Sequence, residues 1–261
     1  MPRCVSSVWN MWTEMDGAPV FRYSGDQALL VEFENEISLE VSGKVKRLMA
    51  ALTQQELPGL GELVPAYRSL LIHYDPERLS CRDLTAAVRR LSQTASALPE
   101  DPVSCLVTEI PVCYEGEYAA DLQEIAAIEQ KTPEEIVRIH SQSDYYVYML
   151  GFAPGHPYGA RMENPFSFKR RPTPRVKIPA GSIVVQLGLS DIIPFDQPCG
   201  WNIIGTTPVP AYDPRKENPF LLQAGQWMRH VPISREEFAA IRRQVEAGTY
   251  VPKTCRKEKT P

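Results

Sequence analysis

The chain has 261 residues, of which 43% are hydrophobic and 23% charged, the composition of a globular protein rather than a disordered or fibrous one. Its formal charge of -4 gives no general attraction for nucleic acid or anionic lipid, which excludes both as expected partners. No apolar stretch approaches the roughly 20 residues that span a bilayer, and residues 1–15 lack the apolar core of a signal peptide, so we expect a cytoplasmic protein.

Residues 1–19 have no clear periodicity and are expected to form an arm. A small α/β domain is expected over residues 20–95, because strand and helix patterns alternate there. Polar residues 92–102 are the expected linker out of it. The elements expected in this domain are a hairpin or strand at 28–31, a helix capped by Ser38 and running to Leu52, a strand centred on 70–72, and a helix from Ser80 or Asp83 to Leu91.

A second domain, a barrel or sandwich, is expected over residues 103–233, because Pro and Gly separate short apolar runs there. A capping-box helix at 234–248 should follow, and then a tail at 249–261 without regular structure. The elements expected in the barrel are strands at 105–114 and 145–153, helices at 119–130 and 132–142, and short apolar runs at 181–188, 191–195, 201–205 and 220–225.

Cysteine and histidine usage gives no sign of a metal centre. The six cysteines include no CxxC pair, which disfavours both a zinc site and a disulfide framework, so we expect free thiols. The phosphate-binding patterns GxGxxG and GxxxxGK[ST] are also absent. We therefore expect no metal and no cofactor bound by this chain, and any ATP to be bound by another chain.

The first segment that could carry chemistry is GFAPGHPYGARM, residues 151–162. Its glycines and prolines force a turning backbone. Phe152, His156, Tyr158 and Arg161 would project from it as an apolar wall, a titratable imidazole, a phenol and a cation. The alternative is an aromatic connection that plugs one end of the barrel.

The second segment is RRPTPRVKIPAGS, residues 170–182, which three prolines should hold extended, with Arg175 and Lys177 held out rather than buried in a ladder. A fixed guanidinium can bind a carboxylate through two hydrogen bonds, which suits a carboxylated substrate. The alternative is a solvated basic surface.

The third segment is DQPCGWNIIGTTP, residues 196–208. Gly200 permits close backbone approach, and Trp201 offers a flat stacking surface or, alternatively, fills the core. We do not expect Cys199 to be a nucleophile, because nothing next to it in the sequence lowers its pKa. His73, His140 and His230 are expected to be structural.

In this order and spacing, GFAPGHPYG, PRVKIPAGS and CGWNIIGTTP resemble the family named for allophanate hydrolase subunit 1, which also contains the B-type subunit of 5-oxoprolinase and the kinase-A-inhibitor proteins. The resemblance extends over about residues 20–240. It implies the fold class that we expect, an α/β N-terminal domain plus a mainly-β, cyclophilin-like barrel as C-terminal domain.

The resemblance also implies a function beside other chains. It indicates the B-type subunit of an ATP-dependent 5-oxoprolinase-like complex that opens 5-oxo-L-proline to L-glutamate. The implied partners are a chain of the 5-oxoprolinase C type or allophanate hydrolase subunit 2 type, and a chain of the 5-oxoprolinase A type. The alternatives are a carboxyltransferase component beside a biotin-bearing partner, an inhibitor of histidine-kinase autophosphorylation, and a barrel that survives as an assembly scaffold.

Combining the residues with the resemblance, we predict His156 and Arg175 as catalytic. The predicted substrate-binding residues are Phe152, Gly155, Tyr158, Ser182, Gln186 and Trp201. The chain departs from the family pattern at His156, where Phe is usual, at Cys199, where a second Gly is usual, and along LGLSDIIPF, residues 187–195. These departures fall in the expected cleft, so the substrate can differ from that of better-known members.

Overall fold

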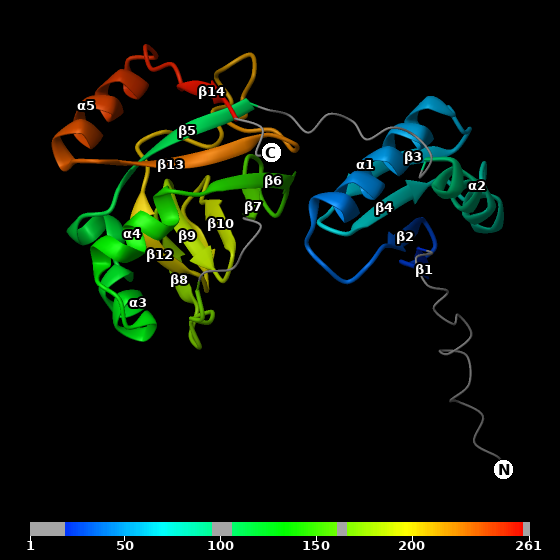
Figure 1. Ribbon diagram of the computed structural model, residues 1–261. Helices are drawn as coiled ribbons and strands as arrows, with labels where there is room; N and C mark the ends of the chain where they lie inside the picture. Colours follow the sequence, from blue (N-terminus) through cyan, green and yellow to red (C-terminus); the bar gives the residue numbers. More distant parts are fainter. Residues whose placement is uncertain (1–18, 96–105, 161–165, 258–261) are drawn as a thin grey trace. The chain divides into compact units, whose positions relative to one another are not determined.

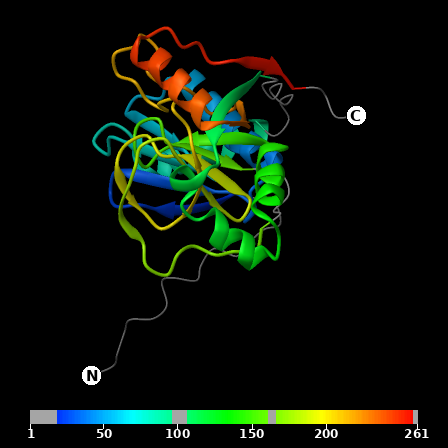
Figure 2. The same ribbon diagram turned by 90° about the vertical axis from the view of Figure 1, so that its left-hand side faces the viewer.

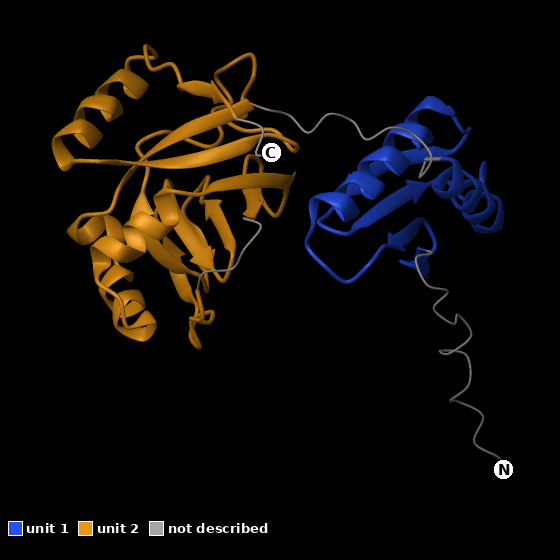
Figure 3. Cartoon of the chain, viewed as in Figure 1, with its two compact units in different colours: residues 1–102 blue, residues 103–261 orange. Residues whose placement is uncertain are grey.

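The computed structural model describes residues 19–95, 106–160 and 166–257. Its chain divides into two compact units, Met1–Pro102 and Val103–Pro261 (Figure 3). Among the described residues, no helix combines the length and the apolar character that crossing a membrane requires.

Unit 1 is an antiparallel sheet of four strands, in the order β1-β2-β4-β3, with two helices packed against it (Figure 1). Ser38 caps α1 by accepting a hydrogen bond from the Val41 amide at 3.2 Å, and the buried stripe of this helix packs on β4, whose side chains alternate between buried and half-buried. The elements are β1 (Val20–Tyr23), β2 (Ala28–Glu32), α1 (Leu39–Gln54), β3 (Leu60–Pro65), β4 (Ser69–Tyr74) and α2 (Cys81–Ala95).

Strand β3 is a correction to the expected order of this unit. We expected a single strand between the helices, centred on 70–72, whereas Leu60–Pro65 forms a second one that pairs with β4. β3 lies at the sheet edge, where a proline at the strand end costs no ladder hydrogen bond, so Pro65 did not break it.

Unit 2 is a closed β-barrel, which confirms the mainly-β C-terminal domain. Seven strands follow one another as β12-β9-β10-β7-β6-β13-β5, and pairing of Thr206 in β12 with Cys113 in β5 closes the ring. A separate two-stranded ribbon, β8 with β11, covers part of its outside. In Figure 2, α5 lies on a different side of the barrel from α3 and α4. The strands are β5 (Leu106–Cys113), β6 (Asp144–Leu150), β7 (Pro157–Ala160), β8 (Arg175–Ile178), β9 (Ser182–Gln186), β10 (Leu189–Ile192), β11 (Gln197–Cys199), β12 (Asn202–Thr206), β13 (Trp227–Ile233) and β14 (Thr254–Arg256); the helices are η1 (Gly116–Ala119), α3 (Leu122–Glu129), α4 (Pro133–Ser141) and α5 (Arg235–Glu246).

Unit 2 differs from the sequence analysis in three places. The run 220–225 contains no strand, whereas Trp227–Ile233, which we did not predict, forms β13 in parallel with β5. The tail expected to lack structure contains β14, antiparallel to β5. An ion pair and a cation–π contact hold this basic segment in place. Lys257 donates to Asp144 at 2.7 Å and lies 3.9 Å from the Trp227 ring centroid.

The barrel interior holds a buried polar cluster among its aliphatic side chains. Tyr114 Oη lies 2.8 Å from His140 Nδ1, and Ser190 Oγ lies 3.0 Å from His140 Nε2. The His230 ring stacks on His140 with centroids 4.2 Å apart, and neither of its nitrogens has a hydrogen-bond partner among the described residues. The structural role expected for His140 and His230 agrees with this position.

We expect His230→Leu to make the free energy of unfolding fall less steeply as the pH is lowered. Burial lowers the His230 pKa from 6.5 to about 3, so the unfolded chain binds a proton near pH 6.5 that the folded chain does not bind. Stability conferred by the neutral ring is therefore complete above pH 6.5 and falls by about 1.4 kcal/mol per pH unit below it.

Urea unfolding at pH 7.5 and pH 4.5 measures this difference. The variant should lose about 2.7 kcal/mol less than the wild type between pH 7.5 and pH 4.5. Equal losses in the two proteins would show that His230 is not the residue responsible.

Candidate functional site

The candidate site begins with a row of side chains across the outside of the barrel. Val184 of β9 pairs with Ile203 of β12 on one side and with Asp191 of β10 on the other. The β10–β7 register pairs Ser190 with Gly159, so the next step sets Asp191 opposite Tyr158. Three of these four positions are buried, and Asp191, with 1% of its surface exposed, is the acidic member of an otherwise largely apolar row.

The loop between β6 and β7 brings an imidazole onto this row. Gly155 has φ +79°, and a side chain there would meet Cβ of Tyr212 at 2.6 Å, so only glycine lets the loop lie flat. His156 follows it and is buried, with its ring centroid 4.8 Å from that of Tyr158 and 5.9 Å from that of Phe152. The loop thus gathers three predicted site residues around one imidazole.

Phe152 holds an uncommon backbone conformation at the edge of the site. Its φ is +64°, and 78% of its surface is exposed. A bulky residue in the left-handed region costs about 1 kcal/mol or more, and such residues concentrate at functional sites. An exposed phenyl ring held at this cost favours contact with a ligand or partner over a role as barrel plug.

His156 and Asp191 form a buried pair, with Nδ1 and Oδ2 3.9 Å apart. Burial lowers the pKa of His156 to about 4 and raises that of Asp191 well above its usual range, although the Gly159 amide, which donates to Oδ1 at 3.3 Å, acts the other way. Burial therefore favours the uncharged form of both groups, the protonated carboxyl and the neutral imidazole. Burial also raises the pKa of Tyr158, so its phenol stays protonated.

The β8–β11 ribbon covers the row at its β9 end. Ile178 packs with Val184, Ile193 and Ile203, and both Cys199 and Trp201 pack against this cluster. Trp201 is thus partly buried against an apolar cluster, as the alternative of a core-filling role predicts. Burial raises the pKa of the Cys199 thiol, and a neutral thiol agrees with our expectation that it is not a nucleophile.

We expected Arg175 to lie outside any strand pairing. It instead lies in β8, where it pairs with Cys199 of β11. Its two terminal nitrogens donate to Asp121 at 2.8 and 2.5 Å. Asp121 is 2% exposed and also accepts from the Ile203 amide at 2.7 Å. The predicted carboxylate-binding cation is therefore already paired with a carboxylate of the chain itself. Lys177 pairs with the exposed Asp196 at 2.8 Å.

Two predicted residues lie apart from the His156 loop. Ser182 is 1% exposed at the start of β9, and its hydroxyl donates to the Pro179 carbonyl at 2.7 Å, which closes the turn before the strand. Gln186 lies at the other end of β9, opposite Leu189 in the hairpin to β10. The structure thus gathers Phe152, Gly155, His156 and Tyr158, and leaves Ser182 and Gln186 at the two ends of a strand. Arg161, the expected cation of the loop, lies outside the described residues.

Sequence reasoning missed two carboxylates, Asp191 and Asp121. A signal existed for Asp191, because an acidic residue directly before Ile192, Ile193 and Pro194 stands inside an apolar run, where a carboxyl group is rarely found. The sequence contains no such signal for Asp121, because an aspartate at this position is typical of a helix N-cap. Its side chain makes no cap hydrogen bond and binds arginines instead.

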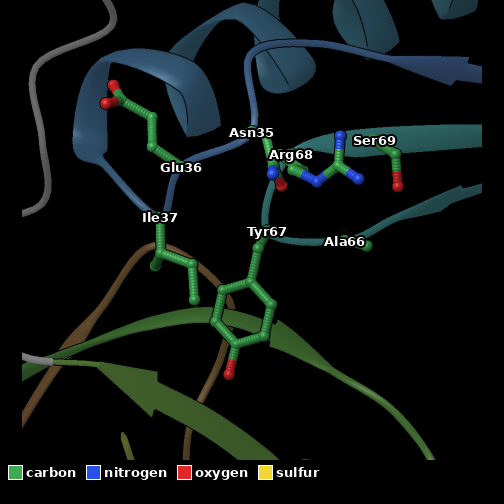
Figure 4. A pocket seen from close by; sticks show the side chains of 7 residues that line it. All are labelled: Asn35, Glu36, Ile37, Ala66, Tyr67, Arg68 and Ser69. Atoms are coloured by element: carbon green, nitrogen blue, oxygen red, sulfur yellow. The ribbon is translucent and has the colours of Figure 1, made fainter. Parts of the chain in front are cut away.

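Neither of two hollows in the described residues contains a predicted site residue. One of about 420 Å³ in unit 1 is lined by the loops before α1 and between β3 and β4, and Figure 4 shows Ile37 and Tyr67 projecting to one side of it while Glu36 points away. Another of about 700 Å³ in unit 2 lies between α4 and the ends of β5 and β13. Within the same residues, no three His, Cys, Asp or Glu side chains are placed to hold a metal ion.

Comparison with known proteins decides the family. The profile of the family described as carboxyltransferase domain, subdomain C and D, matches residues 19–222. The chain belongs to this family. It is 36% identical to the B-type subunit of 5-oxoprolinase from Bacillus subtilis (strain 168), over 84% of this chain and 95% of that protein.

Two solved structures are similar to this chain. The crystal structure of TTHA0988 is 36% identical with a TM-score of 0.67, covering 80% of this chain and 40% of that one. The K. lactis urea amidolyase structure has a TM-score of 0.79 at 18% identity and covers 94% of this chain and 17% of that one, which shows the fold alone. In both cases this chain corresponds to less than half of a longer polypeptide.

Proposed function

We propose that the chain is the B-type subunit of an ATP-dependent 5-oxoprolinase-like complex that opens 5-oxo-L-proline to L-glutamate. The support from comparison is the 36% identity to a 5-oxoprolinase component of this type over nearly its whole length. The structural observation that carries the proposal is the buried pair of His156 and Asp191, 3.9 Å apart, beneath an aromatic loop on the barrel.

This pair suits the chemistry of a cyclic amide. Opening a lactam places negative charge on the carbonyl oxygen and requires a proton on the departing nitrogen. A carboxyl group whose pKa burial raises can donate a hydrogen bond to that oxygen, and an imidazole whose pKa burial lowers can accept a proton from the attacking water and return it to the departing nitrogen. His156 is thus the proposed acid–base residue, and Asp191 joins it as the hydrogen-bond donor.

The remaining predicted residues take roles in the same proposal. Phe152 and Tyr158 supply flat walls for a five-membered ring, and Gly155 keeps the loop close to the barrel. Substrate binding by Ser182, Gln186 and Trp201 stays a prediction. For Arg175 to bind the substrate carboxylate, its guanidinium would have to leave Asp121.

The proposal includes partners. This chain covers 40% of TTHA0988, so more than half of that polypeptide is further protein, which supports a function beside other chains. We propose a chain of the 5-oxoprolinase C type or allophanate hydrolase subunit 2 type, and a chain of the 5-oxoprolinase A type. ATP would be bound by the complex and not by this chain, and a cytoplasmic location is part of the proposal.

A carboxyltransferase role is the second candidate. It is favoured by the family profile, which describes a carboxyltransferase domain, and by 22% identity to the urea amidolyase of Lachancea kluyveri over 88% of this chain. This version needs a biotin-bearing partner and urea or a related amide. Kinase inhibition stays a prediction from the resemblance.

Purification of the tagged chain with its natural partners tests the proposal. The recovered assembly should release glutamate from 5-oxoproline only when ATP is present. A biotinylated partner together with ATP-dependent carboxylation of urea, and no glutamate release, would favour the second candidate. Recovery of a histidine kinase and neither activity would overturn both.

A further inference from the structure

The segment 170–175 carries three arginines, and two of them already form ion pairs with carboxylates of the chain. Arg171 Nη1 donates to Asp121 at 3.0 Å and to Glu124 at 2.8 Å. Arg175 donates to both oxygens of Asp121. Arg170, the third, is exposed and has no ion pair or hydrogen bond from its guanidinium within residues 19–95, 106–160 and 166–257.

The backbone around Arg170 is fixed to the strand that leads into β12. The Arg171 amide donates to the Gly200 carbonyl at 2.9 Å, and Asn202 Nδ2 donates to the Lys169 carbonyl at 3.1 Å. Arg170 lies between these two contacts. Arg170 therefore projects from a backbone segment that is held in place on both sides, and not from a free surface loop.

Gly200 leaves the space in which this guanidinium lies. A Cβ at Gly200 would come within 2.4 Å of Arg170 Nε and 3.1 Å of Nη2. Because Gly200 is itself buried, a side chain there would displace the arginine. The glycine thus permits the close approach of one cation to the backbone next to Cys199.

Arg170 therefore lies on the border of the proposed site. Cys199, the neighbour of Gly200, packs on the cluster that contains Val184, and Val184 is paired with Asp191. Arg170 also acts to lower the pKa of the Cys199 thiol against the larger opposite effect of burial, in keeping with its nearness to that side chain.

We propose that Arg170 binds the carboxylate of the substrate, and that the Asp121–Arg175 pair positions the ribbon beside it. The assignment rests on the proposed function, since it takes the substrate to be a carboxylated lactam. A guanidinium with its donors unused can bind a carboxylate through two parallel hydrogen bonds, whereas Arg175 would first have to leave a buried partner.

Helix α3 supports this arrangement by fastening the segment at both ends. At its N-terminal end Asp121 and Glu124 hold Arg171 and Arg175. At its C-terminal end Glu129 accepts from the amides of Ser167 and Phe168 at 2.6 and 2.9 Å. Arg170 lies on a segment that the helix holds from both sides.

Titration calorimetry on the full chain, with its co-purified partners, tests the assignment independently of turnover. The ligands are 5-oxoproline and 2-pyrrolidinone, the same lactam without the carboxylate. The wild type should bind 5-oxoproline at least 10-fold more tightly, and Arg170→Gln should bind both alike, with Arg170→Lys between them. A 10-fold preference corresponds to about 1.4 kcal/mol.

Lys177→Gln is the matched comparison, seven residues away. Lys177 is exposed and pairs with the exposed Asp196, so this variant removes one cation without disturbing Asp121 and should retain the preference for 5-oxoproline. The assignment is overturned if Arg170→Gln keeps the preference, if the wild type shows none, or if Lys177→Gln also removes it. Loss of glutamate release with the preference intact would instead count against the proposed reaction.

Discussion

Asp191→Asn is expected to reduce 5-oxoproline opening by about 1000-fold while leaving the protein folded, the loss typical of removing an essential proton donor. Asp191 is 1% exposed, and burial raises its pKa well above the usual range, which favours the neutral acid that the proposed proton donor requires. Asparagine has the same shape and no charge, and its oxygen can still accept from the Gly159 amide. Stability should therefore change by less than about 1 kcal/mol.

Asp26→Asn provides the control, because Asp26 is exposed in a turn of unit 1 and the substitution is chemically identical. Turnover by the assembly and the thermal midpoint of the chain are measured for both variants. Full activity in Asp191→Asn would remove the carboxyl group from the mechanism. A large fall in the midpoint would instead show that Asp191 is charged in the folded protein and paired.

Gly155→Ala should destabilise unit 2 by about 3 kcal/mol, from two additive causes. The backbone at Gly155 has φ +79°, which alanine adopts at a cost of about 1 kcal/mol or more. The added Cβ would also lie 2.6 Å from Tyr212 Cβ and 2.9 Å from the Ala211 carbonyl oxygen, neither of which is a flexible chain end. The loop carrying His156 must then move, and activity should fall with stability.

Gly248→Ala separates the two causes. Gly248 has φ +70° in the same unit and nothing within 4 Å of a Cβ, so only the conformational cost of about 1 kcal/mol applies. Calorimetric scans should give a Gly155→Ala midpoint about 5 °C or more below that of Gly248→Ala. Similar midpoints would mean that the 211–212 segment yields and that the close approach is not a constraint.

The aromatic and glycine-rich loop could be predicted well from the sequence, because its residues are adjacent in the chain and their conformational needs are local. Phe152, Gly155, His156 and Tyr158 were predicted together and lie together. The partners that lie far away in sequence could not be predicted. Asp191 reaches His156 across a strand pair, and Asp121 binds Arg175 from 54 residues earlier.

The same difference explains the fold. Helices α1 and α5 are recognisable by their caps and 3.6-residue spacing, and their caps are formed as expected. Strand β13, by contrast, contains Arg229, His230 and Pro232, residues that are typical of a loop. Asp144 pairs with Arg229 at 2.7 Å, and the barrel encloses His230, neither of which a single segment can show.

Strand β14 has a consequence for handling the protein. β5 pairs with β13 along one side, while on the other side β12 pairs with it at Cys113, and residues 253–256 occupy the hydrogen-bonding groups of 106–109. An uncovered strand edge is a template for a second chain. The last described residues thus protect the barrel from self-association, so a tag or fusion is better attached where it leaves Lys257 free to reach Asp144.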